Sequence, residues 1–319
     1  MILEIQIIIA FIVDLFIGDP RSYTHPVTRI ATYALFLERS TRRLIPFSSL
    51  AGAITVAGVV FGVGIITWSI LWVSSLAGWW LQALVSIAIM YYCFATHDLS
   101  KHAKQVETAL QSGDVKLSRQ LVGRLVGRDT KNLDETEIIR GCVESVAENL
   151  VDGVTAPLFY AALAGPIGVA IYKSVNTMDS LFGYKNKKYI EFGWAPARLD
   201  DLLNYIPARI TAATVVITSP LFGLTSSGAW KTLRRDGQKH ASPNSGLTEA
   251  AFAGSMGIRL GGINFYEGVE KKAPYMGDNF NVLSVRHIGL AVKLMLATSV
   301  LFLMTMITIK VLILSLFLI

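Results

Sequence analysis

The feature that most limits the fold of this 319-residue chain is a set of long apolar runs. Four of them, at roughly 50–73, 76–95, 204–224 and 288–319, are long enough to cross the hydrocarbon core of a bilayer, which takes about 20 helical residues. Hydrophobic residues make up 52% of the chain and charged residues 16%, whereas soluble domains carry about 25% charged residues. The sequence therefore predicts an all-α, polytopic integral membrane protein with a lipid bilayer around it.

Two parts of this pattern leave the topology open. The first apolar run, residues 1–17, has no basic leader or small-residue cleavage site, which favours a retained membrane helix over a signal peptide; a short interfacial helix is the alternative. Residues 155–175 and 204–224 are apolar but contain prolines such as Pro166 and Pro207, as broken or re-entrant helices do. We expect this pair to dip into the membrane as re-entrant helices.

The polar blocks between the apolar runs, at roughly 18–48, 96–153, 176–203 and 225–287, are rich in chemically capable residues. We therefore expect membrane-proximal helical loops on one face of the membrane, not linkers, and one domain covering 1–319. The net charge of +6 says little about partners, because membrane proteins collect Lys and Arg in their cytoplasmic loops. No basic patch interleaved with aromatic residues indicates nucleic acid.

The segment 140–152 sets charged residues at four-residue steps just before an apolar segment. Arg140, Glu144, Glu148 and Asp152 fall on one helical face. Carboxylates arranged in this way suit Mg²⁺, which takes one or two protein carboxylates together with substrate phosphate oxygens. An exposed ladder of ion pairs, each worth about 0.2–0.5 kcal/mol, is the structural alternative.

Further clusters lie in the first and third blocks. Asp19, His25 and Arg29 follow a membrane segment, where a turn capped by Asp is the plainer interpretation. Just after the third block, Arg209 lies deep in the apolar run 204–224 and needs a partner. Asp201, two turns earlier, is the candidate.

The fourth block has a loop dense in Ser, Asn and Gly ahead of a predicted helix. Such a loop is able to present backbone N–H groups to a phosphate, and equally able to be a turn. No Walker A or dinucleotide-binding pattern occurs in the chain.

Taken together, four segments resemble the adenosylcobinamide-phosphate synthase family, the membrane enzymes of cobalamin biosynthesis known as CobD or CbiB. They are GDPRSYTHPVTRI, RGCVESVAENLVDGVTAPLFYAALAGPIG, YKSVNTMDSLFGYKNKKYIEFGWAPARLDDLLNYIPARITA and RDGQKHASPNSGLTEAAFAGSMGIRLGG. They follow the family's order and cover over a third of the chain. The departures are Thr28, where Arg or a similar residue is expected, and Leu247-Thr248, where Trp-Pro is expected.

The resemblance implies an ATP-dependent C–N ligase in the cell membrane. The enzyme would join a propionate carboxylate of adenosylcobyric acid to the amine of an aminopropanol phosphate or related amino-alcohol phosphate, giving adenosylcobinamide phosphate through an acyl-phosphate intermediate. It implies Mg²⁺ as cofactor and ATP as co-substrate. An oligomer is compatible with this interpretation.

Phosphoryl transfer depends mainly on positioning and charge neutralisation, so carboxylates and cations carry the expected roles. Mg²⁺ is expected at Glu144, Glu148 and Asp152. The expected catalytic residues are Arg140, Glu144, Glu148, Lys173, Asp200 and Asp201, of which Asp200 or Asp201 serves as a second carboxylate site or as the base for the incoming ammonium. The expected substrate-binding residues are Asp19, His25, Arg29, Asn149, Asn176, Asp179, Tyr184, Lys185, Arg198, His240, Ser242, Asn244 and Ser245.

Two other classes compete with the synthase. One is an AmpE-like regulatory or sensory membrane protein, which would not need the complete set of charged motifs. The other is a small-molecule transporter, which would concentrate polar residues at the membrane midplane. Here the polar residues lie mostly in long blocks at the ends of apolar segments, which favours the enzyme.

Overall fold

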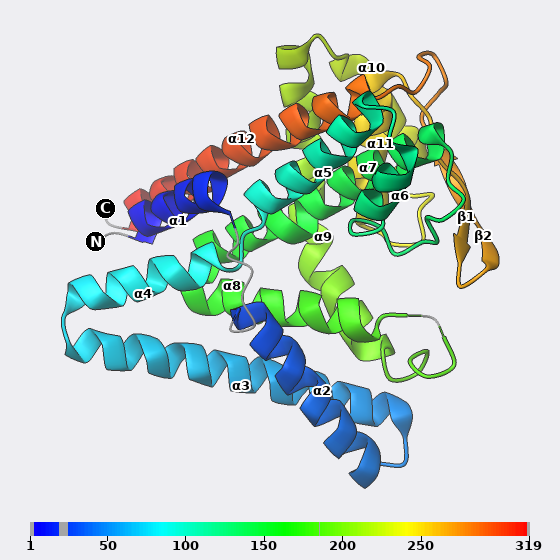
Figure 1. The fold of residues 1–319 in the computed structure, drawn as a ribbon. Helices are drawn as coiled ribbons and strands as arrows, with labels where there is room; N and C mark the ends of the chain where they lie inside the picture. The colour runs from blue at the N-terminus through cyan, green and yellow to red at the C-terminus, as the bar shows by residue number, and fades with distance from the viewer. Residues whose placement is uncertain (1–2, 19–24, 185, 318–319) are drawn as a thin grey trace. The chain divides into compact units, whose positions relative to one another are not determined.

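The structure is a computed structural model that describes residues 3–18, 25–184 and 186–317. The predicted site residues Asp19 and Lys185 lie outside this part of the chain. The described part is mainly helical (Figure 1), and five of its stretches are long and apolar enough to cross a membrane: Ser48–Leu76, Trp79–Gln111, Glu135–Phe182, Trp194–Phe222 and Arg286–Leu316. The predicted class, an all-α polytopic membrane protein, is confirmed.

The chain forms two compact units. Unit 1 comprises Met1–Ala95, Ala156–Asn204 and Thr305–Ile319, and unit 2 comprises Thr96–Thr155 and Tyr205–Met304. Each unit has buried apolar side chains of its own, such as Val59 and Phe182 in unit 1 and Val146 and Phe252 in unit 2. The single domain expected from the sequence stays a prediction.

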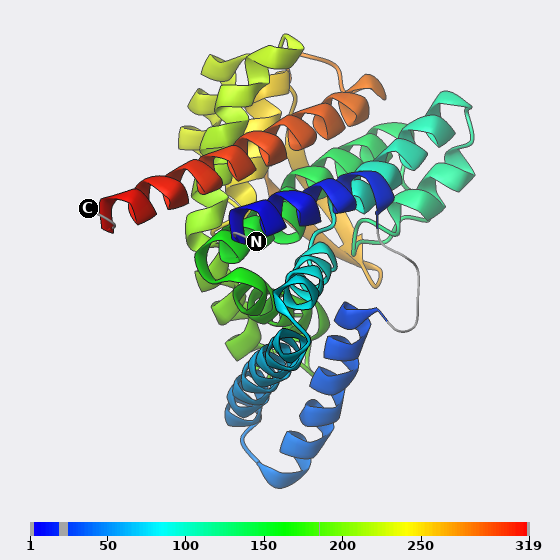
Figure 2. The ribbon, with the colours of Figure 1, turned by 90° about the vertical axis from the view of Figure 1, so that its left-hand side faces the viewer.

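Unit 1 begins with α1 (Leu3–Ile17), α2 (Pro26–Leu44), α3 (Ser48–Leu76) and α4 (Trp79–Tyr91). Helices α3 and α4 form a hairpin (Figure 2). Its turn lies at Gly78, whose φ of 127° is in the positive region that glycine adopts without steric cost. Large apolar side chains on α3, such as Phe61 and Trp68, are exposed, as suits a surface in contact with lipid.

Helix α1 has 15 residues, fewer than the roughly 20 that a straight membrane crossing needs. Its Glu4 forms an ion pair of 3.5 Å with Lys310 of α12 (Arg286–Phe317). The structure thus has a helix in the first apolar run. Whether this helix is a retained membrane helix or a short interfacial helix stays a prediction.

Helix α8 (Ala156–Phe182) is interrupted where the sequence predicts a break. Gly165 has φ 63° and ψ −153°, and Pro166 follows it. Proline lacks the N–H of a helical hydrogen bond and clashes with the preceding turn. Helix α9 (Trp194–Thr218) instead continues through Pro207 and ends in the 3₁₀ turn η2 (Ser219–Phe222). Re-entry of this pair stays a prediction.

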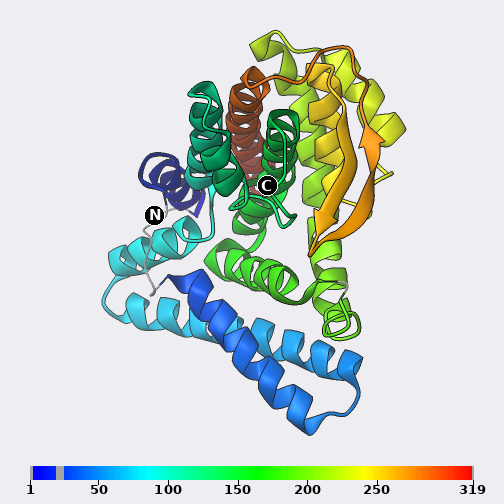
Figure 3. The same ribbon diagram turned by 45° about the vertical axis from the view of Figure 1, so that its right-hand side comes forward.

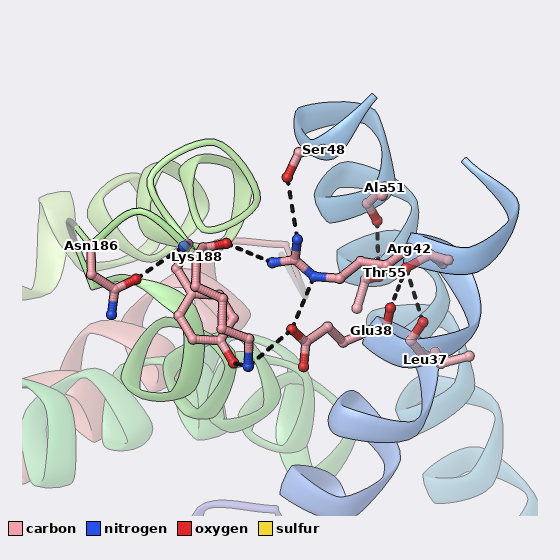
Figure 4. A network of polar contacts seen from close by, with 10 residues as sticks. Leu37, Glu38, Arg42, Ser48, Ala51, Thr55, Asn186 and Lys188 are labelled. Carbon is pink, nitrogen blue, oxygen red and sulfur yellow. Dashed lines mark hydrogen bonds and ion pairs between the residues drawn. The ribbon is translucent and has the colours of Figure 1, made fainter. Parts of the chain in front are cut away.

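The segment between α8 and α9 is fixed to α2 by a polar network (Figure 4). The Arg42 guanidinium donates from Nε to Glu38 Oε1 (3.0 Å) and from a terminal nitrogen to the carbonyl of Lys188 (2.9 Å). It also lies 4.2 Å from the centroid of the Phe192 ring. Glu38 is only 4% exposed. Its buried negative charge is compensated by Arg42 and by Lys188 Nζ, which lies 3.8 Å from Glu38 Oε1.

Unit 2 holds α5 (Thr96–Gln111), α6 (Val115–Val122), α7 (Glu135–Leu150), the π-helical turn η1 (Val151–Thr155), α10 (Ser226–Asp236) and α11 (Ser245–Met256). Helix α7 begins with a capping box, in which the Asp134 and Glu137 side chains each accept from the other residue's backbone N–H. Such a box satisfies two N–H groups that the first turn leaves without partners.

A two-stranded antiparallel hairpin, β1 (Leu260–Tyr266) and β2 (Val269–Met276), follows α11 (Figure 3). Its turn is Glu267-Gly268, with φ of 52° and 77°, the positive values that tight hairpin turns require. The sequence interpretation predicted no strands in this part of the chain.

Asp236, at the end of α10, ties that helix to the residue after β2. The carboxylate is 1% exposed and accepts from Arg235 (2.7 Å), Lys239 (2.6 Å) and the N–H of Gly277 (2.9 Å). Burial alone would raise the pKa of Asp236, but these hydrogen bonds outweigh it and hold the pKa below its ordinary value.

Replacing Asp236 with Asn is expected to lower stability at pH 7 by about 1.5–3 kcal/mol, the usual value of hydrogen bonds to a charged group. Since the folded pKa is depressed, the stabilisation is complete above the unfolded value of about 3.9 and is lost as the pH falls below it. Unfolding in detergent at pH 7, 4 and 3 should therefore show the gap between wild type and Asp236→Asn closing towards pH 3. Asp278→Asn is the control, because Asp278 also accepts from Arg235 but its side chain is 37% exposed; an equal loss in both variants would contradict the prediction.

Candidate functional site

The charged face of α7 is buried against the hairpin in unit 2. Arg140 is 8% exposed and donates to the backbone carbonyls of Gly261 and Ile263 and to Asn264 Oδ1. Glu144 lies 3.6 Å from Arg140. Arg140 and Glu144 therefore do not form an exposed ladder of weak ion pairs. Arg140 joins α7 to β1.

A second arginine, which the sequence interpretation did not single out, completes this network. Arg128 is 7% exposed and places one terminal nitrogen 2.8 Å from Glu144 Oε2, where it also donates to Asn264 Oδ1. A Cβ at position 141 would lie 2.1 Å from the Arg128 guanidinium, so the glycine in the middle of α7 makes room for it. That isolated Gly141 was the available signal, since a glycine inside a helix usually has a packing reason.

The predicted magnesium ligands do not converge on one point. Both Glu144 oxygens are engaged, Oε2 by Arg128 and Oε1 by the N–H of Gly261 at 2.8 Å. Asp152 lies in η1, where the wider π-helical turn breaks the four-residue register that placed it in line with Glu148. Within the described residues, no group of three or more His, Cys, Asp and Glu side chains is arranged to hold a metal ion. The three carboxylates thus do not fit a shared metal site, and a magnesium requirement stays a prediction.

Glu148, one turn beyond Glu144, faces the start of α11. Its side chain is exposed and its Oε1 accepts from Ser245 Oγ at 3.1 Å. Asn149 beside it donates its amide back to the carbonyl of Ser145 at 2.9 Å. Of these two predicted residues, Glu148 is therefore the one that a ligand can reach.

The loop before α11 folds on its own side chains. Ser242 Oγ accepts from the N–H groups of Asn244 (3.3 Å) and Ser245 (3.4 Å), and His240 Nδ1 accepts from the N–H of Ser242 (3.1 Å). These N–H groups have local partners, so the phosphate-binding role expected for this loop stays a prediction. Asn244 also receives a hydrogen bond of 3.5 Å from Arg209.

Arg209 finds partners other than the expected Asp201. It donates to the carbonyl of Tyr205 at 2.7 Å, and its guanidinium lies 3.4 Å from the centroid of the Tyr205 ring. Backbone and aromatic contacts within one helical turn thus accommodate its charge.

The pocket beside α7, hereafter the acidic pocket, has a volume of about 160 Å³. It lies between α7, α11, the hairpin and the segment before α7, and its ionisable lining residues are Arg128, Glu144, Glu148, His240, Glu249 and Tyr266. Glu249 is 5% exposed, and its Oε1 lies 4.0 Å from His240 Nε2. Burial raises the pKa of Glu249 well above its ordinary value; the nearby Glu148 and Glu144 raise it further, while Arg128 lowers it.

A second cluster of predicted residues lies in unit 1, between α8 and α9. Lys173 Nζ donates to Asn176 Oδ1 (3.4 Å), and the Asn176 amide donates to Asp200 Oδ1 (3.4 Å). Asn204 donates to the other Asp200 oxygen (2.9 Å) and accepts from the Tyr172 hydroxyl (2.9 Å). The structure therefore brings Lys173, Asn176 and Asp200 together in one hydrogen-bonded chain.

The remaining predicted residues of unit 1 surround this cluster or lie apart from it. Asp179 and Asp201 are near enough to Asp200 to interact electrostatically with it. Tyr184 and Arg198 are exposed. His25 caps the start of α2, with its Nδ1 accepting from the N–H of Val27 at 3.2 Å, and Arg29 is exposed on the next turn.

The fold and the buried charges define a polytopic helical membrane protein with polar clusters at the ends of its apolar segments. The family model described as CobD/Cbib protein matches residues 7–295, so the chain belongs to the CobD/CbiB family. No solved structure matches the chain.

Relatives from several bacteria support this membership. The chain is 46% identical over 295 residues to the cobalamin biosynthesis protein CobD of Leptospira interrogans serogroup Icterohaemorrhagiae serovar copenhageni, covering 92% of this chain and 94% of that protein. It is 41% identical over 295 residues to the CobD protein of Pelobacter propionicus (91% and 90% covered). It is 42% identical over 275 residues to that of Clostridium perfringens (86% and 87% covered).

Proposed function

We propose that the chain acts in cobalamin biosynthesis, as its relatives' names state of them, and that it forms an amide bond with the energy of ATP. The substrates would be adenosylcobyric acid and an amino-alcohol phosphate, and the product adenosylcobinamide phosphate. Neighbouring carboxylates in a small pocket, where Glu249 is buried and Glu148 is exposed, are the observation that carries this proposal. Such a pocket suits a small cation that must lose a proton, and an ammonium group that becomes a nucleophile is one.

A carboxylate and an ammonium do not condense in water, so the carboxylate must first be activated. Transfer of a phosphoryl group from ATP would give an acyl phosphate, with magnesium arriving as the ATP complex. Phosphoryl transfer is favoured by cations held in place. In unit 1, Lys173 is proposed to neutralise phosphate charge, and Asp200, held by Asn176 and Asn204, to be a second carboxylate site.

Arg140, expected from the family resemblance to be catalytic, is instead proposed to position other residues. Its guanidinium is committed to two backbone carbonyls and to Asn264, so it positions the hairpin wall of the acidic pocket. In the same way, Glu144 holds Arg128 in place. Glu148, exposed beside Ser245, remains available to ligands.

Membranes from cells that express the chain are expected to convert adenosylcobyric acid into a product heavier by the chosen amine less one water. The assay supplies ATP, Mg²⁺ and one amine at a time, namely aminopropanol phosphate, ethanolamine phosphate or threonine phosphate, and reads the mass of the corrinoid. Omitting ATP should abolish the gain, and membranes without the chain give the background. No mass gain with any amine would end the synthase proposal, and ATP-independent uptake of corrinoid into proteoliposomes would favour a transporter.

A further inference from the structure

The acidic pocket holds more negative charge than its arginines neutralise. Glu144 is paired with Arg128 at 2.8 Å and Arg140 at 3.6 Å. Among the described residues, Glu148 and Glu249 have no such arginine: Glu148 accepts from a serine hydroxyl, and Glu249 has His240 at 4.0 Å. Carboxylates so placed favour a cationic ligand, because uncompensated charge is costly at the buried Glu249 and the exposed Glu148 adds a second negative charge beside it.

A second and independent feature points to an anionic oxygen in the same place. The Nε–H of Arg128 is buried and has no hydrogen-bond partner within the described residues, although the side chain lines the pocket and is 7% exposed. A buried donor without an acceptor costs about 1–3 kcal/mol. An oxygen of a bound ligand, placed at this Nε, would remove that cost.

We propose that the acidic pocket is the subsite for a small zwitterion, the amino-alcohol phosphate, and that Glu249 accepts the proton of its ammonium group. The ammonium lies between Glu148 and Glu249, and a phosphate oxygen accepts from Arg128 Nε. This proposal rests on the proposed function, which supplies the activated carboxyl group made with ATP. It assigns to Glu249 the base role that the sequence suggested for Asp200 or Asp201.

The proton and electron movements follow from these positions. Ionised Glu249 takes one proton from the ammonium, and the lone pair so freed forms the C–N bond at the activated carboxyl carbon. The bond between the carboxyl carbon and the phosphate oxygen then breaks, and the phosphate leaves with the electron pair of that bond. The nitrogen loses its second proton to the departing phosphate. A carboxyl whose pKa is raised above its ordinary value is a better proton acceptor, which suits a general base. The ionisable groups that face Glu249 are Arg128 from the segment before α7, Glu144 and Glu148 from α7, His240 from the loop before α11, and Tyr266 from β1.

Hydroxylamine separates this proton transfer from carboxylate activation. It is neutral at neutral pH, needs no base, and converts an acyl phosphate into a hydroxamate. In the full-length purified protein, Glu249→Gln should form corrinoid hydroxamate within about threefold of wild type, and should form amide from ethanolamine phosphate about 10²-fold or more slowly, the usual contribution of a general base. Glu270→Gln, an exposed glutamate on β2 of the same unit, should keep both rates.

Each outcome has a distinct meaning. If Glu249→Gln loses both products or keeps both, the role of Glu249 is overturned. The Tm of this variant should stay close to that of wild type, since Gln keeps the size and shape of the Glu side chain. If wild type forms neither product, the proposed function fails. If wild type forms amide but no hydroxamate, the dependence of the amide-forming rate on pH decides. The acid limb of this profile should move in Glu249→Asp and should vanish from the residual activity of Glu249→Gln. An unchanged acid limb in both variants would refute the assignment.

Fragments of the substrate test the two ends of the pocket without altering the protein. Ethanolamine, which lacks the phosphate, and ethyl phosphate, which lacks the amine, should each bind at least about tenfold more weakly than ethanolamine phosphate, because each loses a hydrogen bond to a charged group. Calorimetric titration of the detergent-solubilised protein measures this. Equal binding of ethyl phosphate and ethanolamine phosphate would exclude an ammonium subsite.

Discussion

Glu144→Ala is expected to destabilise the protein by about 3–5 kcal/mol, the usual result of removing one partner from a buried ion pair. The reason is what the substitution leaves behind. Arg128 and Arg140 are 7% and 8% exposed, and without Glu144 their two positive charges would face each other with no anion between them. The N–H of Gly261, which donates to Glu144 Oε1, would also lose its acceptor.

Thermal unfolding in detergent, followed by tryptophan fluorescence, measures this loss. Glu135→Ala is the matched control, because Glu135 is exposed in the first turn of the same helix and its interaction with the helix dipole is worth less than about 1 kcal/mol. Glu144→Gln keeps the size of the side chain and an acceptor for Gly261, and should fall between the two. Similar Tm values for Glu144→Ala and Glu135→Ala would show that the two arginines are solvated and not part of a buried network.

The spanning helices were predictable because their signal is local. Length and apolarity of consecutive residues give the spans of α3, α4 and α12, and Pro166 after a glycine gives the break in α8. Lys173, Asn176 and Asp200 were predicted as site residues from the family resemblance, and α8 and α9 bring them together. Their chemical roles are not tested by this proximity.

The wall of the acidic pocket was harder to predict, because its contacts join residues far apart in the sequence. Arg128 reaches Asn264, 136 residues later, and no periodic pattern encodes such a pair. Glu249 stands among small and apolar residues of α11, where a carboxylate gives no sign of facing Glu148. The magnesium triad failed to assemble for a related reason: a four-residue spacing assumes regular α-helix, and the π-helical turn η1 begins at Val151.

The crossing of α10 and α11 has room for glycine alone, so Gly254→Ala is expected to cost about 3 kcal/mol or more. A Cβ at Gly254 would lie 2.4 Å from the carbonyl oxygen of Gly228, and a Cβ at Gly228 would lie 2.5 Å from that of Gly254. Overpacking usually costs about 1–3 kcal/mol, and here the obstacle is backbone on both sides, so no side chain can rotate away. The helices would have to separate.

Gly64→Ala in α3 provides the same substitution without the clash, since its Cβ would meet only the Ile171 side chain at 3.5 Å. It should be neutral or stabilising by up to about 1 kcal/mol, because alanine favours helix over glycine. Separation of α10 from α11 would also shift Ser245 and Glu249, which α11 carries towards Glu148 and His240. Gly254→Ala is therefore expected to weaken ethanolamine phosphate binding as well as to lower Tm, and a lower Tm with unchanged binding would show that the acidic pocket does not depend on this crossing.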